Sequence, residues 1–411
     1  MKNRELIKKT KEINRFLRIA YAKSIKKRKA FNIPFCRSIK ESIGAFIEVI
    51  YKGLPCPYSL KGTCAPCGYS NIPVAVSKEK IWQSLVTQTD YILKNFEKLI
   101  LKKDKVDLPH DPKNLVRFAL SPTGSFFSNF EIPPKYRKEI LEKFLRFSKE
   151  RNFEFEIFIE ARAEDIINLT EREKREITNI LNELNVTILL GLESINDLTR
   201  NVIYCKDLEL NDFEKAIEII RKDLKCKSGA FIFAGLHSMN EIETFNDIKK
   251  TLLYLKKRKI LPVIMIENLK SFTLPHLLYL YERHKMIDPF TIHKIILFMS
   301  SIFENKKLEW LFADPVGGPP APKVHAFKNR TKIACPKCSN KILKGIRNLR
   351  ENYSFNEYLK TTNAIENHKC FLKYESYLNS LKSQKNLKER VKSNLDFALK
   401  KKVEYVKKIS F

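Results

Sequence analysis

The sequence predicts an α/β fold, a partial barrel of about six parallel strands with helices packed around it. Two observations predict this class. Between residue 45 and about residue 300, short apolar runs with β-branched residues alternate with helix-periodic segments, the pattern of repeated βαβ units. A loop with three cysteines follows the first apolar run, and functional groups of α/β proteins usually lie at the carboxyl ends of strands. Six strands suit an open, partial (β/α)6 barrel better than a closed barrel of eight.

The apolar runs and the periodic segments give the elements in order. Strands are expected at Ala45–Tyr51, Leu115–Leu120, Phe153–Glu160, Val186–Gly191, Gly229–Ala234 and Pro262–Glu267. Helices are expected between them at Ser77–Leu101, Lys135–Glu150, Ala163–Leu184, Asp212–Asp223 and Glu241–Lys257. We expect three parts along the chain: a basic helical arm at 1–40, the barrel at 41–312, and a C-terminal helical module with a basic tail helix at 313–411.

The basic arm at 1–40 and three histidines after the last expected strand each have a structural interpretation. The basic arm could grip a phosphate backbone or pack as a helix on the outside of the barrel, and the two roles are compatible. His276, His284 and His293 follow the last expected strand with spacings that fit no ligand motif. They are therefore expected as ordinary core or surface residues.

Charge and cysteine content limit the class of function. Lys and Arg total 77 against 47 Asp and Glu, a formal net charge of +30. A field of that sign attracts polyanions, and nucleic acid is the commonest one, although a lysine-rich solvated surface would give the same count. No apolar run approaches the roughly 18–20 residues that span a bilayer, and the basic N-terminus lacks the apolar core of a signal peptide. We therefore expect a cytoplasmic protein without a membrane partner, whose nine cysteines serve metal ligation or catalysis rather than disulfides.

The loop Leu54–Asn71 holds Cys56, Cys64 and Cys67, the last two in a Cys-x-x-Cys pair. Prolines and glycines interrupt the loop, so its backbone can wrap tightly. Three thiolates on one short loop leave one corner of a cubane iron–sulfur cluster open for an exogenous ligand. A closed zinc site would need a fourth protein donor, which the loop does not contain. The loop is therefore predicted to hold a [4Fe–4S] cluster.

Polar or glycine residues stand at the ends of four later strands. They are Gly124 and Ser125, then Glu160 and Arg162, then Gly191 and Glu193, and lastly Gly235 with His237 nearby. The carboxyl ends of parallel strands meet at one rim, so together these residues favour a ligand site there. The alternative for Glu160 and Arg162 is a structural ion pair with barrel neighbours.

A second cysteine group lies near the C-terminus. Cys335 and Cys338 form a Cys-x-x-Cys pair, and His368 and Cys370 follow later. Such a set can make a tetrahedral zinc site, with His325 as the alternative to His368 as fourth ligand. His368 and Cys370 are only two residues apart, so their binding to one ion would require a bent backbone. The alternative is a pair of reduced thiols in a helical module.

These motifs resemble the radical S-adenosylmethionine superfamily. Seven residues separate Cys56 from Cys64, where three are common, and this spacing with Cys-Ala-Pro-Cys-Gly-Tyr is similar to the branch that contains the elongator catalytic subunit. The radical subunit of archaeosine synthase looks closest. The resemblance covers roughly residues 40–375 and rests on matching segments in order: Gly124-Ser125-Phe126, Glu131-Ile132-Pro133, Glu160-Ala161-Arg162, Gly191–Ser194, Glu267–Leu269, Thr273–Leu277, Asp314–Gly318 and the final Cys-x-x-Cys.

The resemblance implies cofactors, partners and roles. Cys56, Cys64 and Cys67 would hold the cluster, whose open iron binds S-adenosylmethionine for cleavage to a 5′-deoxyadenosyl radical. Tyr69 would lie near the adenine, Gly124 and Ser125 near the methionine amine, and Glu160, Arg162 and Glu193 near the ribose or carboxylate. The implied reaction is C–N bond cleavage on a tRNA that carries a lysine-modified deazaguanine. An electron donor of the flavodoxin or ferredoxin type and a partner subunit are implied as well.

Two segments depart from the expected pattern, and both concern the substrate. Tyr204–Asp207 and Gly235–His237 replace turns that the resemblance leads us to expect near the substrate. Three functions therefore remain in view: a radical enzyme acting on tRNA, one of the same fold acting on a small molecule or peptide, and a non-catalytic RNA-binding protein with two metal knuckles.

Overall fold

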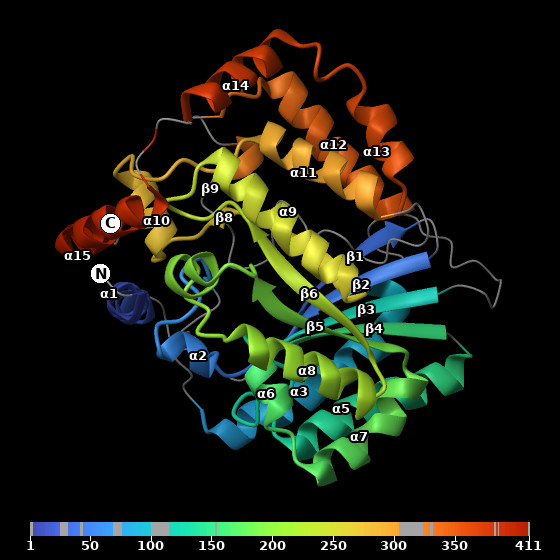
Figure 1. The fold of residues 1–411 in the computed structure, drawn as a ribbon. Helices are drawn as coiled ribbons and strands as arrows, with labels where there is room; N and C mark the ends of the chain where they lie inside the picture. The colour runs from blue at the N-terminus through green and yellow to red at the C-terminus, as the bar shows by residue number, and fades with distance from the viewer. Residues whose placement is uncertain are drawn as a thin grey trace.

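One twisted sheet of seven strands organises the molecule (Figure 1). The computed structural model describes residues 3–24, 32–41, 44–68, 76–99, 115–152, 154–303, 324–328, 332–381, 384 and 386–409. The strands pair in sequence order as β1 (Phe35–Glu41), β2 (Gly44–Ile50), β3 (Leu115–Ser121), β4 (Glu154–Ala161), β5 (Val186–Glu193), β6 (Lys227–Ala234) and β7 (Leu261–Ile266). From β2 to β7 every pairing is parallel, so the six predicted strands and the partial barrel are confirmed.

The strand β1 is the element that the sequence prediction misplaced. It lies in the stretch predicted as a helical arm, and it pairs antiparallel with β2 from Phe35↔Ile50 to Glu41↔Gly44. An edge strand pairs on one side only and commonly carries charged residues. The basic residues of β1 therefore looked like a continuation of the basic helix before it.

Helices cover the outer face of the sheet, and further helices, among them α11–α14, lie beyond it (Figure 1). Around the barrel lie α2 (Pro57–Leu60), α3 (Lys78–Lys94), α5 (Pro134–Arg151), α6 (Ala163–Ile167), α7 (Glu171–Glu183), η1 (Leu198–Ile203), α8 (Leu210–Lys222) and α9 (Glu241–Lys257). The helix predicted over 163–184 is two helices, because Thr170 and Glu173 form a capping box that starts α7. The remaining elements are α1 (Asn3–Ser24), β8 (Asn268–Leu269), α10 (Leu274–Leu280), α11 (Pro289–Ile302), β9 (Val324–His325), η2 (Ala326–Lys328), α12 (Pro336–Asn352), α13 (Phe355–Thr362), α14 (Lys369–Ser380) and α15 (Leu387–Ile409).

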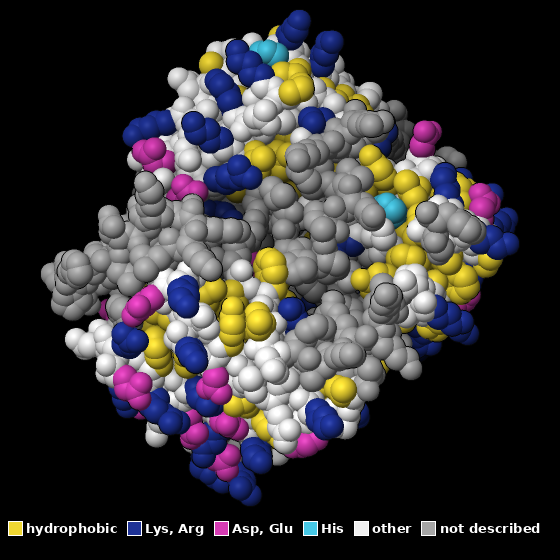
Figure 2. All heavy atoms as spheres, turned by 180° about the vertical axis from the view of Figure 1, so that it is seen from behind, with side chains coloured by type: hydrophobic (Ala, Val, Ile, Leu, Met, Phe, Trp, Pro, Cys, Tyr) yellow, Lys and Arg dark blue, Asp and Glu magenta, His cyan; other side chains and the backbone are white. Residues whose placement is uncertain are grey.

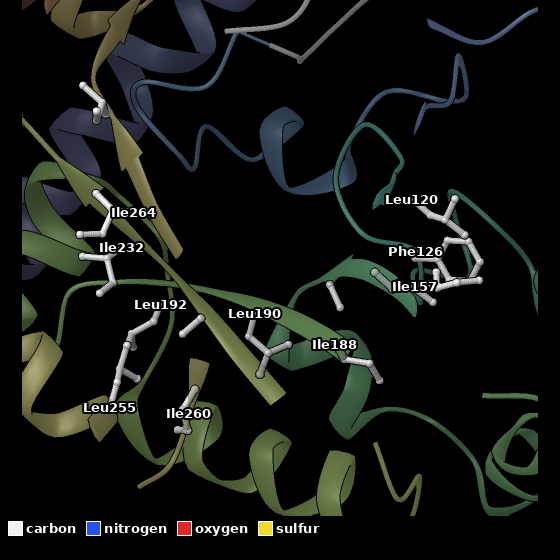
Figure 3. Packing of buried hydrophobic residues seen from close by; sticks show 14 of the residues in the cluster. Leu120, Phe126, Ile157, Ile188, Leu190, Leu192, Ile232, Leu255, Ile260 and Ile264 are labelled. Carbon is white, nitrogen blue, oxygen red and sulfur yellow. The ribbon is translucent and has the colours of Figure 1, made fainter. Parts of the chain in front are cut away.

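The apolar core lies between the sheet and its covering helices. Alternate strand residues point outward into this layer, as the period of two requires. Figure 3 shows part of it, with contributions from the five strands β3–β7, from α9 and from connecting segments: Leu120, Phe126, Ile157, Ile188, Leu190, Leu192, Ile232, Leu255, Ile260 and Ile264.

The inner face of the sheet changes from apolar to polar along the strands. Its middle is filled by Phe46, Ala119, Phe158, Leu189 and Val263. Two residues further along β2, β3, β4 and β5, on the same face, stand Glu48, Ser121, Glu160 and Gly191. The carboxyl ends of the strands therefore surround a polar chamber, and the cysteine loop begins at this end of β2.

The N-terminal helix α1 packs onto the molecule rather than projecting from it. Leu6, Ile13 and Leu17 of α1 are fully buried in a cluster shared with Leu395 and Tyr405 of α15. The two helices are also joined by ion pairs, such as Lys9–Asp396 at 2.7 Å. None of the described helices has both the length and the apolarity to cross a lipid bilayer.

The three histidines after β7 are core residues, as predicted. His276 bonds to the hydroxyl of Tyr405 at 2.7 Å, and His293 bonds to that of Tyr358 at 2.7 Å. His284 lies 2.6 Å from the carboxylate of Glu267. All three are buried.

Candidate functional site

The cysteine loop wraps tightly just past the carboxyl end of β2. Cys56 is the N-cap residue of the short helix α2, and it is buried, whereas Cys64 and Cys67 are partly exposed. Gly62 at φ +83° and Cys64 at φ +58° turn the chain through left-handed conformations. The amide of Cys67 then donates to the carbonyl of Cys64 at 2.9 Å, which closes a turn around the Cys-x-x-Cys pair.

Two other segments fix this loop in place. The amides of Cys64 and Ala65 donate to the carbonyls of Cys205 and Tyr204, both at 2.7 Å. From α1, the buried guanidinium of Arg18 donates to the carbonyls of Ser59, Thr63 and Cys64 at 2.5, 2.5 and 2.9 Å. The residues between Cys56 and Cys64 are thus the docking site of α1, which gives the long spacing a structural role.

The donor set of the first cysteine loop suits a cluster better than a single ion. In the described residues, one group of metal-binding side chains has all ligand atoms within 4.8 Å of one another, and the loop cysteines are not part of it. A closed structural zinc site takes four protein donors, and the loop offers three thiolates. In a cubane each thiolate binds a different iron, and three thiolates leave one iron open for another ligand. This donor set is the one that a [4Fe–4S] cluster with an open iron requires.

Arg162 supplies positive charge beside the loop. One of its guanidinium nitrogens lies 3.5 Å from Sγ of Cys64, and the guanidinium stacks 3.8 Å from the ring centre of Tyr58. Burial opposes the charge, but the neighbouring Cys64 and Glu164 raise the pKa of Arg162 above its usual value. The ion pair of Arg162 is with Glu164 at 2.6 Å, not with Glu160. A permanent cation here stabilises thiolates and bound anionic groups.

Gly124 and Ser125 lie against the buried cysteine. A Cβ at Gly124 would collide with Sγ of Cys56 and would come within 2.5 Å of Glu131 Oε1, so only glycine fits. The amide of Ser125 donates to Oε1 of Glu131 at 3.0 Å, and its hydroxyl accepts from the amide of Arg162 at 3.1 Å. Burial raises the pKa of Glu131 to about 8. Its second oxygen has no hydrogen-bond partner in the described structure, which leaves an acceptor for a ligand.

A buried ion pair crosses the polar chamber. Nζ of Lys206 lies 2.8 Å from the carboxylate of Glu193, and both side chains are almost completely buried. Burial works against the charge of Lys206, but Glu193 and Cys64 raise its pKa. Gly191 makes room for this pair, because a Cβ there would collide with the ammonium. Burial also raises the pKa of Glu160 to about 7, and Lys206 and Glu193 act on it electrostatically.

The predicted cofactor residues are thus gathered, with one outside the described structure. Cys56, Cys64, Gly124, Ser125 and Arg162 form one connected set. Glu193 joins it through its ion pair with Lys206, and Glu160 lies close enough for both charges to act on it. Tyr69 lies outside the described residues.

Sequence reasoning gave no site role to four charged residues. Glu131 and Lys206 were named only within matching or departing segments, and Glu48 and Lys270 were not singled out. Lys270 lies against Gly68 of the loop, and burial lowers its pKa to about 8 although Cys67 acts in the other direction. Glu48 carries the one charge in an otherwise apolar strand, which was a usable signal.

The C-terminal group comes together as a compact four-donor set. The ligand atoms of Cys335, Cys338, His368 and Cys370 all lie within 4.8 Å of one another. Cys335 is the N-cap residue of α12 and His368 is that of α14. The extended N-cap conformation supplies the bend that lets His368 and Cys370 face one point. The side chain of His325, the alternative ligand, lies outside the described residues.

The fold and the first cysteine loop define a class. A partial parallel barrel with three cysteines after its first parallel strand is the architecture of radical S-adenosylmethionine proteins. No family model matches the chain. It is similar to archaeosine synthase subunit beta of Thermococcus kodakarensis, at 25% identity over 276 residues, which cover 67% of this chain and 77% of that protein. This relative confirms the resemblance that the motifs indicated.

Other similarities cover smaller parts. An uncharacterized protein of Methanocaldococcus jannaschii is 28% identical over 183 residues, so the match spans 44% of each chain. The radical S-adenosylmethionine methyltransferase TsrM of Kitasatospora setae covers 57% of this chain and 36% of its own, with 11% identity and a TM-score of 0.35. Archaeal Elp3 of Methanocaldococcus infernus covers 55% of this chain and 51% of its own, with 16% identity and a TM-score of 0.39.

Proposed function

We propose that the protein is a radical S-adenosylmethionine enzyme that acts on a modified base of tRNA, as a lyase of the archaeosine-synthase type. One observation carries the enzyme class: three cysteines at the carboxyl end of the first parallel strand, clamped by α1, beside a chamber of buried charged residues. When bound, a [4Fe–4S] cluster supplies the electron that cleaves S-adenosylmethionine to a 5′-deoxyadenosyl radical, which abstracts hydrogen from the substrate.

The residues of the chain would bind and orient the cofactor. The free oxygen of Glu131, beside Gly124, would accept from the methionine amine, whose positive charge favours the ionised carboxylate that burial alone disfavours. Arg162 and Lys206 provide fixed cations for the carboxylate, and Glu160 and Glu193 provide acceptors for ribose hydroxyls. Ser125 positions Arg162 through its hydroxyl, and Tyr69 would lie by the adenine. The apolar middle of the inner face would exclude water from beneath the reacting atoms.

The tRNA substrate is supported by charge and by the relative. The net charge of +30 favours a polyanionic partner. The similar protein of Thermococcus kodakarensis is named as a subunit of archaeosine synthase, which supports a modified tRNA base and a partner subunit here. The required electron would come from a flavodoxin or a ferredoxin. Tyr204–Asp207, at the chamber, departs from the pattern that the resemblance leads us to expect near the substrate.

Anaerobic reconstitution with iron and sulfide tests the proposal. Wild-type protein should absorb in the visible iron–sulfur region and release 5′-deoxyadenosine from S-adenosylmethionine with dithionite. Release without any tRNA turnover or binding would favour an enzyme that acts on a small molecule or peptide. Absence of both cluster and release would leave a non-catalytic RNA-binding protein.

We further propose that Cys335, Cys338, His368 and Cys370 hold one structural zinc ion. Four closely spaced donors of these types match a closed tetrahedral site. The ion would join the first turn of α12 to that of α14, and helix N-termini also stabilise thiolates. The site would then act on the stability of the C-terminal module rather than on chemistry.

Replacing Cys338 by serine should remove this zinc. We expect elemental analysis to show about one zinc per chain in the wild type and well under half of that in Cys338→Ser, because a three-ligand site binds far more weakly. Cys226→Ala is the matched control, since this buried thiol, among the residues that the structure describes, bonds only to the carbonyl of Leu224. Equal zinc contents in the two variants would contradict the assignment.

A further inference from the structure

The outer face of α12 carries an unbroken stripe of cations. Lys337, Lys341, Lys344 and Arg347 recur every three or four residues, opposite the buried face that contains Ile342, Ile346 and Leu349. Lys337, Lys344 and Arg347 are exposed and Lys341 is partly exposed. None of the four forms an ion pair with a described residue; Lys341 bonds only to the carbonyl of Asn363, at 3.4 Å. Within the part of the chain that the structure describes, the stripe is therefore positive charge without a paired acid.

A set of lysines on two barrel helices is different, because a carboxylate accompanies each of them. On α5 and α8, four lysines that are at least partly exposed each pair with an acid: Lys138–Glu142, Lys149–Glu183, Lys215–Asp212 and Lys222–Glu218. Figure 2 shows a similar contrast over the described parts of one face. At the top of the molecule, where α12–α14 lie, Lys and Arg gather with few acids, whereas the two signs interleave at its lower end. Lysine-rich composition alone would not produce this segregation.

The candidate zinc site brings a further positively charged side chain, that of Lys369, next to the stripe. Each ligand pair brackets an exposed lysine: Lys337 lies between Cys335 and Cys338, and Lys369 lies between His368 and Cys370. Because the four ligand atoms converge within 4.8 Å, the main chains that carry these two lysines are held close together. The stripe from Lys337 to Arg347 extends about 15 Å along the helix at about 1.5 Å per residue. That length matches roughly four consecutive phosphates of one strand.

We propose that this surface, made of Lys337, Lys341, Lys344, Arg347 and Lys369, binds the phosphate backbone of the substrate RNA. The proposal rests on the tRNA substrate proposed above and assigns part of its contact to the C-terminal module, away from the radical chamber. Such contacts position the nucleic acid and carry no base specificity. The surface would hold the body of the RNA while the target base reaches the barrel.

The experiment measures binding of a fluorescein-labelled, unmodified tRNA transcript to the full chain by anisotropy at several salt concentrations. The stripe variant replaces Lys337, Lys341, Lys344 and Arg347 by glutamine. The control variant replaces Lys138, Lys149, Lys215 and Lys222 by glutamine, which removes the same total charge from paired sites. We expect the stripe variant to bind at least tenfold more weakly, with a salt slope smaller by about three. The control variant should stay within about threefold of the wild type.

Each other outcome excludes a specific part of the proposal. Equal losses in the two variants would show that net charge, and not this surface, attracts the RNA. A stripe variant that binds like the wild type overturns the surface assignment while leaving the tRNA substrate in place. A wild type without salt-dependent tRNA binding overturns the proposed substrate instead. Zinc content and thermal unfolding of both variants verify their folding.

Discussion

Replacing Cys64 by alanine is expected to reduce the iron of the reconstituted protein from about four atoms per chain to nearly none. The remaining Cys56 and Cys67 would leave two corners of a cubane without a protein ligand, and two-ligand clusters do not persist in water. Cys64 also lies nearest to Arg162, so its loss would leave that buried cation without the sulfur beside it. Iron and sulfide analysis and the visible absorption of the anaerobic protein measure the effect. Release of 5′-deoxyadenosine should disappear with the iron.

Cys205→Ala provides the control for this experiment. Cys205 contacts the same loop, but through its main chain: its carbonyl accepts from the amide of Cys64 at 2.7 Å. Its thiol is buried and makes only a long contact of 3.7 Å to the carbonyl of Gly62. Alanine preserves the main-chain bond, so the iron content should stay within about a fifth of the wild type. Unchanged iron in Cys64→Ala would overturn the cluster assignment and, with it, the proposed enzyme class.

Most of the fold could be predicted because buried parallel strands have a recognisable local sequence pattern. Strands buried on both faces are short apolar runs, and the helices between them keep a strict amphipathic period. Long-range pairing leaves no such local signal. The edge strand β1 pairs with β2 and looks like basic helix in isolation, so it was predicted wrongly. The break before α7 depended on a two-residue cap inside a periodic stretch, Thr170 with Glu173.

The candidate site could be predicted where residue type alone determines chemistry. Paired cysteines and glycines at strand ends were recognised from the sequence. The structure places Gly124 so close to Cys56 that no side chain larger than hydrogen fits there. Residues that act through burial were missed, because burial is a property of the folded chain. Lys206 is an ordinary lysine in the sequence, and only the fold shows it almost completely buried against Glu193. Arg18 gave a misleading signal, since it looked like one more phosphate-binding residue of a basic arm.

Replacing Arg18 by methionine is expected to lower the free energy of unfolding by about 3–5 kcal/mol and to reduce iron occupancy at least severalfold. Methionine keeps much of the apolar stem but removes every donor. The carbonyls of Ser59, Thr63 and Cys64 would then lose a charged partner in a buried setting. Urea unfolding of the metal-free protein measures the first effect, and iron analysis after reconstitution measures the second. Arg18→Lys should recover only part of both, because an ammonium cannot fork between three acceptors as a guanidinium does.

Arg15→Met separates the role of Arg18 from a general need for positive charge on α1. Arg15 lies one turn away on the same helix and also donates to a loop carbonyl, that of Lys61 at 3.0 Å, but it is exposed to solvent. Water can replace that bond, so its loss should cost less than about 1 kcal/mol and leave the iron content unchanged. If both variants showed the same change in unfolding free energy and iron content, α1 would contribute to the loop only by packing over it. If Arg18→Met alone lost iron while keeping a cooperative unfolding transition, α1 would be part of the cluster site. A protein truncated by residues 1–40 would then lose the cluster site. Its weaker RNA binding could therefore not be attributed to loss of an RNA-binding arm.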